Sequence, residues 1–336
     1  MIDRASLSAK FLENAGWGKA AREYLAGDAS DRRYERARLG AQTAVLMDAP
    51  PGTGDEPAKF LAIATHLSAL GLSAPKCFDS DLRHGFLLLE DLGDGLYARL
   101  IAQDLSLEQP LYAAAIDVLA HLQSHPAPPD VPSLTATDWA TAAGFALEWY
   151  AFAITGAHTD AKDFHSVLTD LISRHADGPR VLILRDFHAE NLLWLPDRAG
   201  LERVGLLDFQ LGQLGQPGYD VVSLLQDARR DVGVEVEMEA KARFVAAAGL
   251  DDLLFQDAYA VLGAQRALRI LGVFARLCLV GAKPGYLHLI PRVWEHLQRN
   301  LAAPVLAPLA KICAEVLPKP TAPALAIIGS KCGHFR

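Results

Sequence analysis

The spacing of apolar residues predicts helices through most of the chain after about residue 96. Apolar positions recur there at intervals of three and four residues, which is typical of a helix with one buried face. One pair of strands is expected among these helices, between residues 181 and 209. The segments with helical spacing are 107–124, 139–154, 163–175, 235–248, 253–282 and 293–317.

Before residue 96 the pattern is mixed, with helical spacing at 5–26 and 58–70 and short apolar runs that predict strands at 43–47 and 85–90. A Pro- and Gly-rich loop follows the first strand, and the sequence DLGDG after the second predicts a turn or hinge. A small β-rich part therefore precedes a larger helical part, and the expected fold class is α+β. The last residues, 317–336, carry little apolar pattern and are expected to form a flexible tail.

Composition narrows the class of protein. The 336 residues are 51% apolar and 21% charged, as expected for a globular chain that is long enough for two lobes. The net charge of −8 argues against a nucleic-acid or anionic-membrane partner. No apolar signal segment is visible near the start, and three arginines interrupt the most apolar later stretch, 260–280. Four scattered cysteines lack metal-ligand or redox spacing, so we expect a cytoplasmic protein.

The most informative chemistry lies in the expected strand pair, VLILRDFHAENLLWLPDRAGLERVGLLDF. An apolar strand ends at Asp186, a second begins at Asn191, and a third ends at Asp208. If the loop between the last two spans 196–203, Asn191 lies opposite Asp208. Three oxygen-bearing side chains would then converge, as a hard cation such as Mg²⁺ and its phosphate ligands require. The alternative is a surface hairpin with ordinary polar ends.

The motif spacing also resembles a known family. Asp186, four residues, Asn191 and a later Asp208-Phe209 are similar to the catalytic loop and metal motif of the protein-kinase superfamily. The segments LLLEDLG and GQPGYDVVSLLQD resemble the hinge and post-metal region of aminoglycoside and choline kinases. On these motifs the chain is identified as a member of the aminoglycoside phosphotransferase family, with the resemblance spanning residues 25–300.

The resemblance implies a two-lobed, protein-kinase-like fold with ATP between the lobes. Residues 1–92 would form the small β-rich lobe with the nucleotide-covering loop and hinge, and 93–316 the helical lobe with the catalytic loop and acceptor site. It also implies roles: Asp186 would accept or orient the proton of the acceptor hydroxyl. Asn191 and Asp208 would hold Mg²⁺, and the backbone of Glu90 and Leu92 would meet the adenine edge.

One position departs from the family. The strand that normally presents a phosphate-binding lysine carries Met47, which has no charge, so an inactive ATP-binding pseudokinase stays open as an alternative. A relocated charge is the other interpretation, because four arginines lie beside the nucleotide-covering loop: Arg32, Arg33, Arg36 and Arg38. Strand alternation puts Arg33 alone on its face, and we expect Arg33, with Ser30 of the loop, to contact the nucleotide. The alternative is that all four arginines are solvated.

Family membership leaves the acceptor open among aminoglycosides, choline, homoserine, methylthioribose and sugars. The helical part lacks the dense aromatic cluster that a quaternary ammonium would need. Its helices carry arginines rather than the acidic groups that suit polycationic aminoglycosides, which favours a neutral or anionic acceptor. Arg229 and Arg266 are the predicted acceptor contacts, with ordinary surface arginines as the alternative.

A finer resemblance narrows the acceptor. The segments GDASDRRY, VLMDAPP, LRDFHAENLLWL and QRALRILGVFARL are similar to the anomeric N-acetylmuramate/N-acetylglucosamine kinases of bacterial cell-wall recycling, and the similarity includes Met47. It implies transfer of phosphate from ATP to the anomeric hydroxyl of a small-molecule sugar for peptidoglycan recycling. A kinase of another hydroxyl acceptor is the alternative. The sequence leaves the oligomeric state open.

Overall fold

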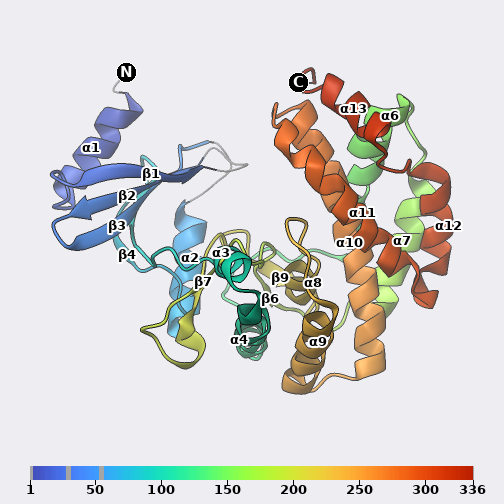
Figure 1. The fold of residues 1–336 in the computed structure, drawn as a ribbon, viewed down its shortest axis with the longest axis horizontal. Coiled ribbons are helices and arrows are strands. Elements are labelled where there is room, and N and C mark those ends of the chain that lie inside the picture. The colour runs from blue at the N-terminus through green and yellow to red at the C-terminus, as the bar shows by residue number, and fades with distance from the viewer. Residues whose placement is uncertain (1–2, 28–31, 53–56, 336) are drawn as a thin grey trace. The chain divides into compact units, whose positions relative to one another are not determined.

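A computed structural model describes residues 3–27, 32–52 and 57–335 (Figure 1). The chain folds into two compact units, each built from two stretches of sequence. The first unit takes residues 1–107 and 189–211, and the second takes 108–188 and 212–336. The expected lobe boundary after residue 92 falls inside the first unit, and the division into lobes 1–92 and 93–316 stays a prediction.

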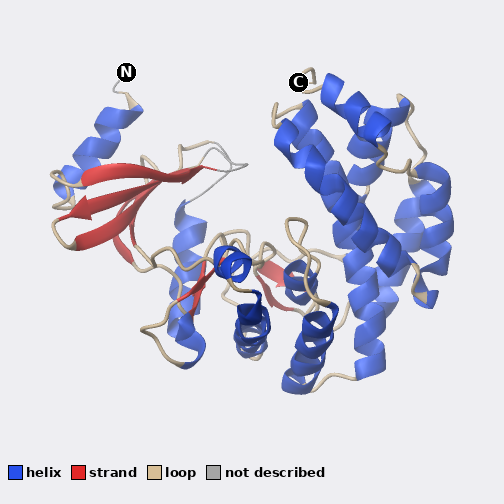
Figure 2. Ribbon diagram, viewed as in Figure 1, coloured by secondary structure: helices blue, strands red, loops and turns tan. Residues whose placement is uncertain are grey.

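The first unit contains a five-stranded antiparallel sheet with the order β1-β2-β3-β5-β4 (Figure 2). Its strands are β1 (Ala21–Gly27), β2 (Arg33–Leu39), β3 (Gln42–Asp48), β4 (Cys77–Asp81) and β5 (Phe86–Glu90). A two-residue turn joins β2 to β3, and Gly40 adopts its left-handed conformation with φ of 61°. The strands expected at 43–47 and 85–90 are confirmed, because β3 and β5 form the apolar centre of this sheet.

Two helices belong to the sheet unit, α1 (Arg4–Asn14) and α2 (Pro57–Ala69). Phe11 and Leu12 of α1 form a buried cluster with residues of β3 and β5. The expectation of one helix over 5–26 is wrong in its second half, where the chain turns and forms β1. The helix ends because Gly16 takes a φ of 81° and the Trp17 N–H donates back to the Leu12 carbonyl at 2.7 Å.

The first unit also holds α3 (Tyr97–Gln103), the short 3₁₀ segments Leu105–Leu107 and Gly200–Arg203, and a hairpin of β7 (Leu192–Trp194) with β8 (Val204–Leu206). The predicted hairpin register is wrong by one residue, since Leu192 pairs with Leu206. The Leu195 N–H donates to the Arg203 carbonyl at 2.8 Å, so pairing runs one residue further than expected and shortens the loop. Asn191 therefore lies opposite Leu207, not Asp208.

The second unit is helical and is organised around α10 (Asp252–Leu279), the longest helix of the described residues. Gly272 lets α10 approach its neighbour closely, because a Cβ there would lie 2.2 Å from the Phe145 carbonyl carbon. The remaining elements are α4 (Glu108–Gln123), α5 (Ala136–Ala143), a π-helical segment (Ala146–Ala151), α6 (Phe152–Thr155), α7 (Lys162–His175), β6 (Val181–Ile183), β9 (Gln213–Gly215), α8 (Tyr219–Leu225), α9 (Val234–Ala248), two 3₁₀ segments (Pro284–Leu289 and Pro304–Leu306), α11 (Ile290–Leu301), α12 (Ala307–Val316) and α13 (Ala322–Ser330).

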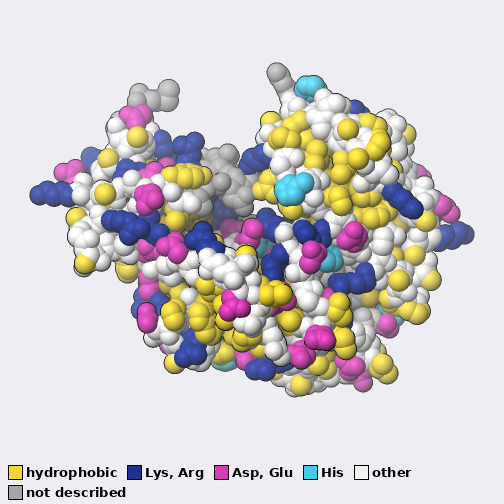
Figure 3. All heavy atoms as spheres, viewed as in Figure 1, with side chains coloured by type: hydrophobic (Ala, Val, Ile, Leu, Met, Phe, Trp, Pro, Cys, Tyr) yellow, Lys and Arg dark blue, Asp and Glu magenta, His cyan; other side chains and the backbone are white. Residues whose placement is uncertain are grey.

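The predicted α+β class is confirmed by the antiparallel sheet of the first unit and the helices of the second. The segment expected to be a loose tail instead forms α13, whose Ile328 is fully buried. Lys331 anchors it further by donating to the Ala153 carbonyl at 2.6 Å. No helix in the described ranges is long and apolar enough to cross a membrane. Figure 3 shows basic and acidic side chains interspersed over the face drawn.

Candidate active site

The loop after β6 carries the predicted catalytic residue Asp186 in the second unit. Arg185, just before it, has a φ of 72°, a conformation that a residue with a side chain rarely adopts. Such strain persists only where the surroundings hold the backbone in place. The chain passes from the second unit to the first between His188 and Ala189, within the Asp186 to Asn191 motif.

The strained loop is held by Asp220, a fully buried residue in the first turn of α8. Its two carboxylate oxygens accept hydrogen bonds from the Leu184 N–H at 2.6 Å and the Arg185 N–H at 2.9 Å. Burial raises the pKa of Asp220 to about 7, although both N–H groups favour its ionised form. Ser223, one turn later, donates to the Arg185 carbonyl at 3.0 Å. Helix α8 therefore fixes the backbone on both sides of Arg185.

Positive charge surrounds Asp186 within the second unit. Burial acts to raise the pKa of Asp186, but nearby cations, chiefly Arg269, outweigh burial and hold the pKa below its ordinary value of 3.8. Asp186 is therefore ionised at neutral pH and can accept a proton or a hydrogen bond from a hydroxyl group. Burial lowers the pKa of the neighbouring His188, which favours the neutral imidazole.

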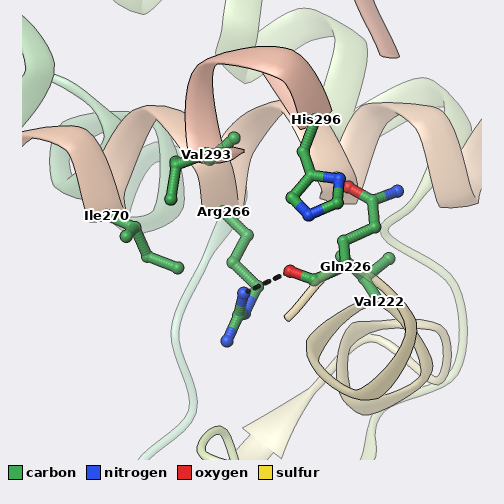
Figure 4. Close-up of a pocket in the computed structure, with 8 residues that line it drawn as sticks. Val222, Gln226, Arg266, Ile270, Val293 and His296 are labelled. Atoms are coloured by element: carbon green, nitrogen blue, oxygen red, sulfur yellow. Dashed lines mark hydrogen bonds between the residues drawn. The ribbon is translucent and has the colours of Figure 1, made fainter. Parts of the chain in front are cut away.

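The two predicted acceptor arginines lie in the same unit as Asp186. Figure 4 shows Arg266 of α10 in a small pocket beside the end of α8, with its guanidinium directed at Gln226. Arg266 donates to the Ser223 hydroxyl at 2.9 Å and to the Gln226 carbonyl at 3.4 Å. Through Ser223 it also supports the loop that carries Asp186. Arg229 is half-buried, with Nη1 3.5 Å from His188 Nε2. Contact of either arginine with an acceptor stays a prediction.

The predicted metal ligands belong to the first unit, at the open end of the β7–β8 hairpin. The Asn191 carbonyl accepts from the Leu207 N–H at 2.9 Å, which ends the ladder immediately before Asp208. Asp208 then takes a φ of 55° as the chain leaves the strand. Phe209 anchors this turn by stacking on Phe60 of α2, with ring centroids 4.8 Å apart. Asp208 and Asn191 therefore lie at neighbouring positions at the open end of the β7–β8 hairpin, held there by a fixed backbone turn.

Asp208 is held by two neighbours through one of its oxygens. Oδ1 accepts from Arg32 Nη2 at 2.8 Å and from Gln210 Nε2 at 2.9 Å. Within the described ranges Oδ2 receives no hydrogen bond, and the side chain is 31% exposed. Oxygen donors from one carboxylate and one carboxamide are the ligand types that Mg²⁺ takes beside nucleotide phosphates. The residues at this turn therefore fit a Mg²⁺ ion.

The predicted hinge residues follow β5. The Glu90 N–H already donates to the Lys76 carbonyl at 2.7 Å, so this N–H is not available to an adenine edge. Arg36 fixes the following turn from β2, with its Nε 2.8 Å from Asp91 Oδ2 and its Nη2 3.0 Å from Asp94 Oδ1. The Leu92 N–H takes part in none of the hydrogen bonds among described residues. Contact of residues 90 and 92 with an adenine edge stays a prediction, which would use the Glu90 carbonyl and the Leu92 N–H.

The described part of the structure gives no contact that tests the remaining predicted nucleotide residues. Met47 is buried in β3 with 1% of its surface exposed, so it offers no contact to a phosphate group. Arg33 is exposed on β2 and pairs in register with Asp48. Ser30 lies outside the described residues. The predicted roles of Arg33 and Ser30 stay predictions.

The structure reveals one contact that sequence reasoning missed, the ion pair between Arg32 and Asp208. Alternation correctly separates Arg32 and Arg36, which are 9% and 6% exposed, from Arg33. It cannot show which face of the strand meets the metal motif, because that depends on residues 176 positions away. For Arg36, the two aspartates beside the hinge, Asp91 and Asp94, were a weak sequence signal that a buried arginine would pair with them.

Comparison with known proteins places these features in context. Residues 22–262 match the model described as the phosphotransferase enzyme family. The N-acetylmuramate/N-acetylglucosamine kinase of Caulobacter vibrioides is 39% identical, covering 91% of this chain and 95% of that protein. The kinase of the same name from Pseudomonas putida is 32% identical, covering 91% and 92%. The crystal structure of an ADP-bound aminoglycoside phosphotransferase has a TM-score of 0.58 at 15% identity, over 88% of this chain and 97% of that one.

Proposed function

Because the chain belongs to the phosphotransferase enzyme family, we propose that it is an ATP-dependent kinase of N-acetylmuramate and N-acetylglucosamine. The membership confirms the family predicted from the motifs. The proposed reaction transfers the terminal phosphate of ATP to the anomeric hydroxyl of the sugar, giving a sugar 1-phosphate. An enzyme that uses ATP in this way is expected to work in the cytoplasm.

The proposed roles follow the phosphoryl-transfer template, in which positioning and charge stabilisation do most of the catalysis. Asp186, ionised and fixed by the loop that α8 holds, would orient the acceptor hydroxyl and receive its proton. Asn191 and Asp208 would hold Mg²⁺, which supplies charge neutralisation to the phosphates when bound. The carbonyl of Glu90 and the N–H of Leu92 would pair with the adenine edge.

The observation that carries the acceptor class is the charge around Asp186. Arg185, Arg266 and Arg269 all act on this carboxylate, and its pKa lies below the ordinary value. Arg266 makes no ion pair with a carboxylate in the described part of the chain, and its hydrogen bonds go to the Ser223 hydroxyl and the Gln226 carbonyl. A cationic environment opposes a polycationic acceptor and suits a neutral or anionic one. N-acetylmuramate carries a lactyl carboxylate and N-acetylglucosamine is neutral, so both fit.

The test is ADP release with Mg-ATP across N-acetylmuramate, N-acetylglucosamine, kanamycin, choline and homoserine. Asp186→Asn serves as the blank, because it keeps the size of the side chain but removes the base. We expect turnover with the two amino sugars and none with kanamycin or choline. Turnover with kanamycin alone would move the protein to another acceptor class. Nucleotide binding without turnover on any acceptor would favour the pseudokinase alternative.

A further inference from the structure

The usual lysine of the nucleotide site is missing together with its partner. In protein kinases a strand lysine, positioned by a glutamate from the following helix, contacts the nucleotide phosphates. Here β3 carries the buried Met47 instead. Helix α2, Pro57–Ala69, contains no Asp or Glu along its length. Since both members of the pair are replaced, a positive charge for the phosphates has to come from another element.

Arg32 brings a buried cation to the predicted metal ligand within the same unit. Its Nη2 lies 2.8 Å from Asp208 Oδ1, and its side chain is only 10% exposed. Its Nη1 donates to the Tyr34 hydroxyl at 3.3 Å. Arg32 is the residue immediately before β2, and Tyr34, which its Nη1 contacts, pairs in register with Met47. The cation therefore contacts the register partner of the residue that stands where the family has its lysine.

The arginines of β2 itself are engaged elsewhere or exposed. Arg36 is bound to Asp91 and Asp94 at the hinge. Arg38 is 49% exposed and lies 3.9 Å from Glu23. Arg33 is exposed, and its register partner Asp48 is already paired with Arg4. Of these four arginines, Arg32 is thus the one that is both buried and beside the metal motif.

We propose that Arg32 is the phosphate-binding cation of the nucleotide site, in the place of the lysine that Met47 replaces. The inference rests on the proposed function, because it assumes a nucleotide at Asn191 and Asp208. Arg32 occupies Oδ1 of Asp208 and leaves Oδ2 without a hydrogen-bond donor in the described ranges, so one guanidinium orients the metal ligand without covering it. The planar guanidinium of arginine also matches the geometry of phosphate oxygens.

The test compares the binding of ADP and of adenosine by isothermal titration calorimetry, with Mg²⁺ present. Arg32→Ala should weaken ADP binding by about 10- to 100-fold, the cost of losing a charge-assisted hydrogen bond of roughly 1.5–3 kcal/mol. It should leave adenosine binding unchanged, because adenosine carries no phosphate. Arg32→Lys should recover part of the ADP affinity. Arg38→Ala removes an exposed arginine from β2 and should change neither ligand.

Several outcomes would overturn the inference. Arg32→Ala protein that binds ADP like the unaltered protein excludes Arg32, and a loss confined to Arg33→Ala transfers the role to that residue. Equal loss of ADP and adenosine would mean that the whole site is distorted. If Arg32→Ala does not fold, as judged by circular dichroism, Arg32→Gln keeps a donor for Asp208 and should still lose ADP affinity. Unaltered protein that binds neither ligand would refute the proposed function as well.

Discussion

The hinge turn offers a sharp stability prediction, because one arginine neutralises a buried carboxylate there. Arg36 and Asp91 have side chains 8% and 7% exposed, and two of their atom pairs lie at 2.8 and 3.0 Å. Arg36→Met removes the charge but keeps most of the aliphatic volume. Asp91 is then a buried anion whose remaining contacts include the Gly93 N–H at 3.0 Å. Breaking a buried ion pair from one side costs about 3–5 kcal/mol, and we expect that loss in the free energy of unfolding.

Asp94 provides the matched control. It also binds Arg36, at 3.0 Å, but its side chain is 61% exposed. Exposed ion pairs contribute roughly 0–1 kcal/mol, so Asp94→Asn should have little effect. The double variant Arg36→Met with Asp91→Asn removes both buried charges and should recover most of the loss. Both aspartates pair with Arg36, so a larger loss of stability at the Arg36–Asp91 pair than at Asp94 would be caused by burial and not by pairing alone.

Urea unfolding followed by far-UV circular dichroism measures these differences, and ADP titration shows whether the hinge is disturbed. We expect Arg36→Met to lose ADP and adenosine affinity together, because the hinge supports the adenine and not the phosphates. A loss of less than about 1 kcal/mol for Arg36→Met, similar to Asp94→Asn, would refute the reasoning, since the pair would then behave as an exposed ion pair.

The pH dependence gives an independent check on the same pair. Burial acts to raise the pKa of Asp91, but the Arg36 hydrogen bond and charge and the Gly93 N–H together hold it below its ordinary value of 3.8. A carboxylate with a lowered folded pKa contributes stability above its unfolded pKa, and that stability is lost as pH falls through the folded value. Without Arg36 the folded pKa of Asp91 rises, so the variant regains stability on protonation while the unaltered protein loses it. The stability gap between unaltered and Arg36→Met protein should therefore be constant near neutral pH and narrow as pH falls towards and below 3.8. A gap that persists fully in acid would contradict the assignment.

Three further predictions concern the catalytic loop and β3. Asp220→Asn leaves one of the Leu184 and Arg185 N–H groups without an acceptor. The free energy of unfolding should therefore fall by about 1–3 kcal/mol, and kcat should change more than KM. An unchanged kcat would show that Asp220 does not brace the loop. Arg269→Ala removes the cation that acts most on Asp186, so the acid limb of the kcat/KM profile should move to higher pH, and an unmoved limb would contradict this. Met47→Lys buries a charge without an acidic partner on α2, so the free energy of unfolding measured in urea should fall by about 3–5 kcal/mol. A variant as stable as the unaltered protein would show that the lysine finds an acidic partner elsewhere.

Elements that bury one face were predictable from sequence alone. The helical spacing at 163–175, 235–248 and 253–282 corresponds to α7, α9 and α10, because each packs an apolar stripe inside the second unit. Strand β1 was not predictable in this way. Its residues from Ala21 to Leu25 are all exposed, so no alternation marks it, and its place in the sheet comes from pairing with β2 alone. An edge strand of this kind is specified by its neighbour.

The candidate site shows the same difference between features encoded locally and features set by distant contacts. Asp186, Asn191 and Asp208 could be predicted as site residues because their spacing along the chain is itself the motif, and the structure places each beside the end of a short strand. The predicted pairing of Asn191 with Asp208 is wrong by one residue. The 3₁₀ turn at Gly200–Arg203 sets the loop length, and no local signal in the sequence encodes that length. Contacts between distant segments, such as Arg32 with Asp208, depend on packing that only the folded chain defines.

The loss of the strand lysine and the position of Arg32 can be understood as one change. Central strand β3 is buried against β2 and β5, and a lysine at position 47 would need an acidic partner to offset its desolvation. With no such residue in α2, an apolar side chain is the stable choice, and Met47 adds to the core. At the start of β2 the same charge has a partner already present, since Asp208 lies 2.8 Å from Arg32. Under the role proposed for Arg32, the cation lies where its desolvation is offset by a carboxylate that the proposed metal site also uses.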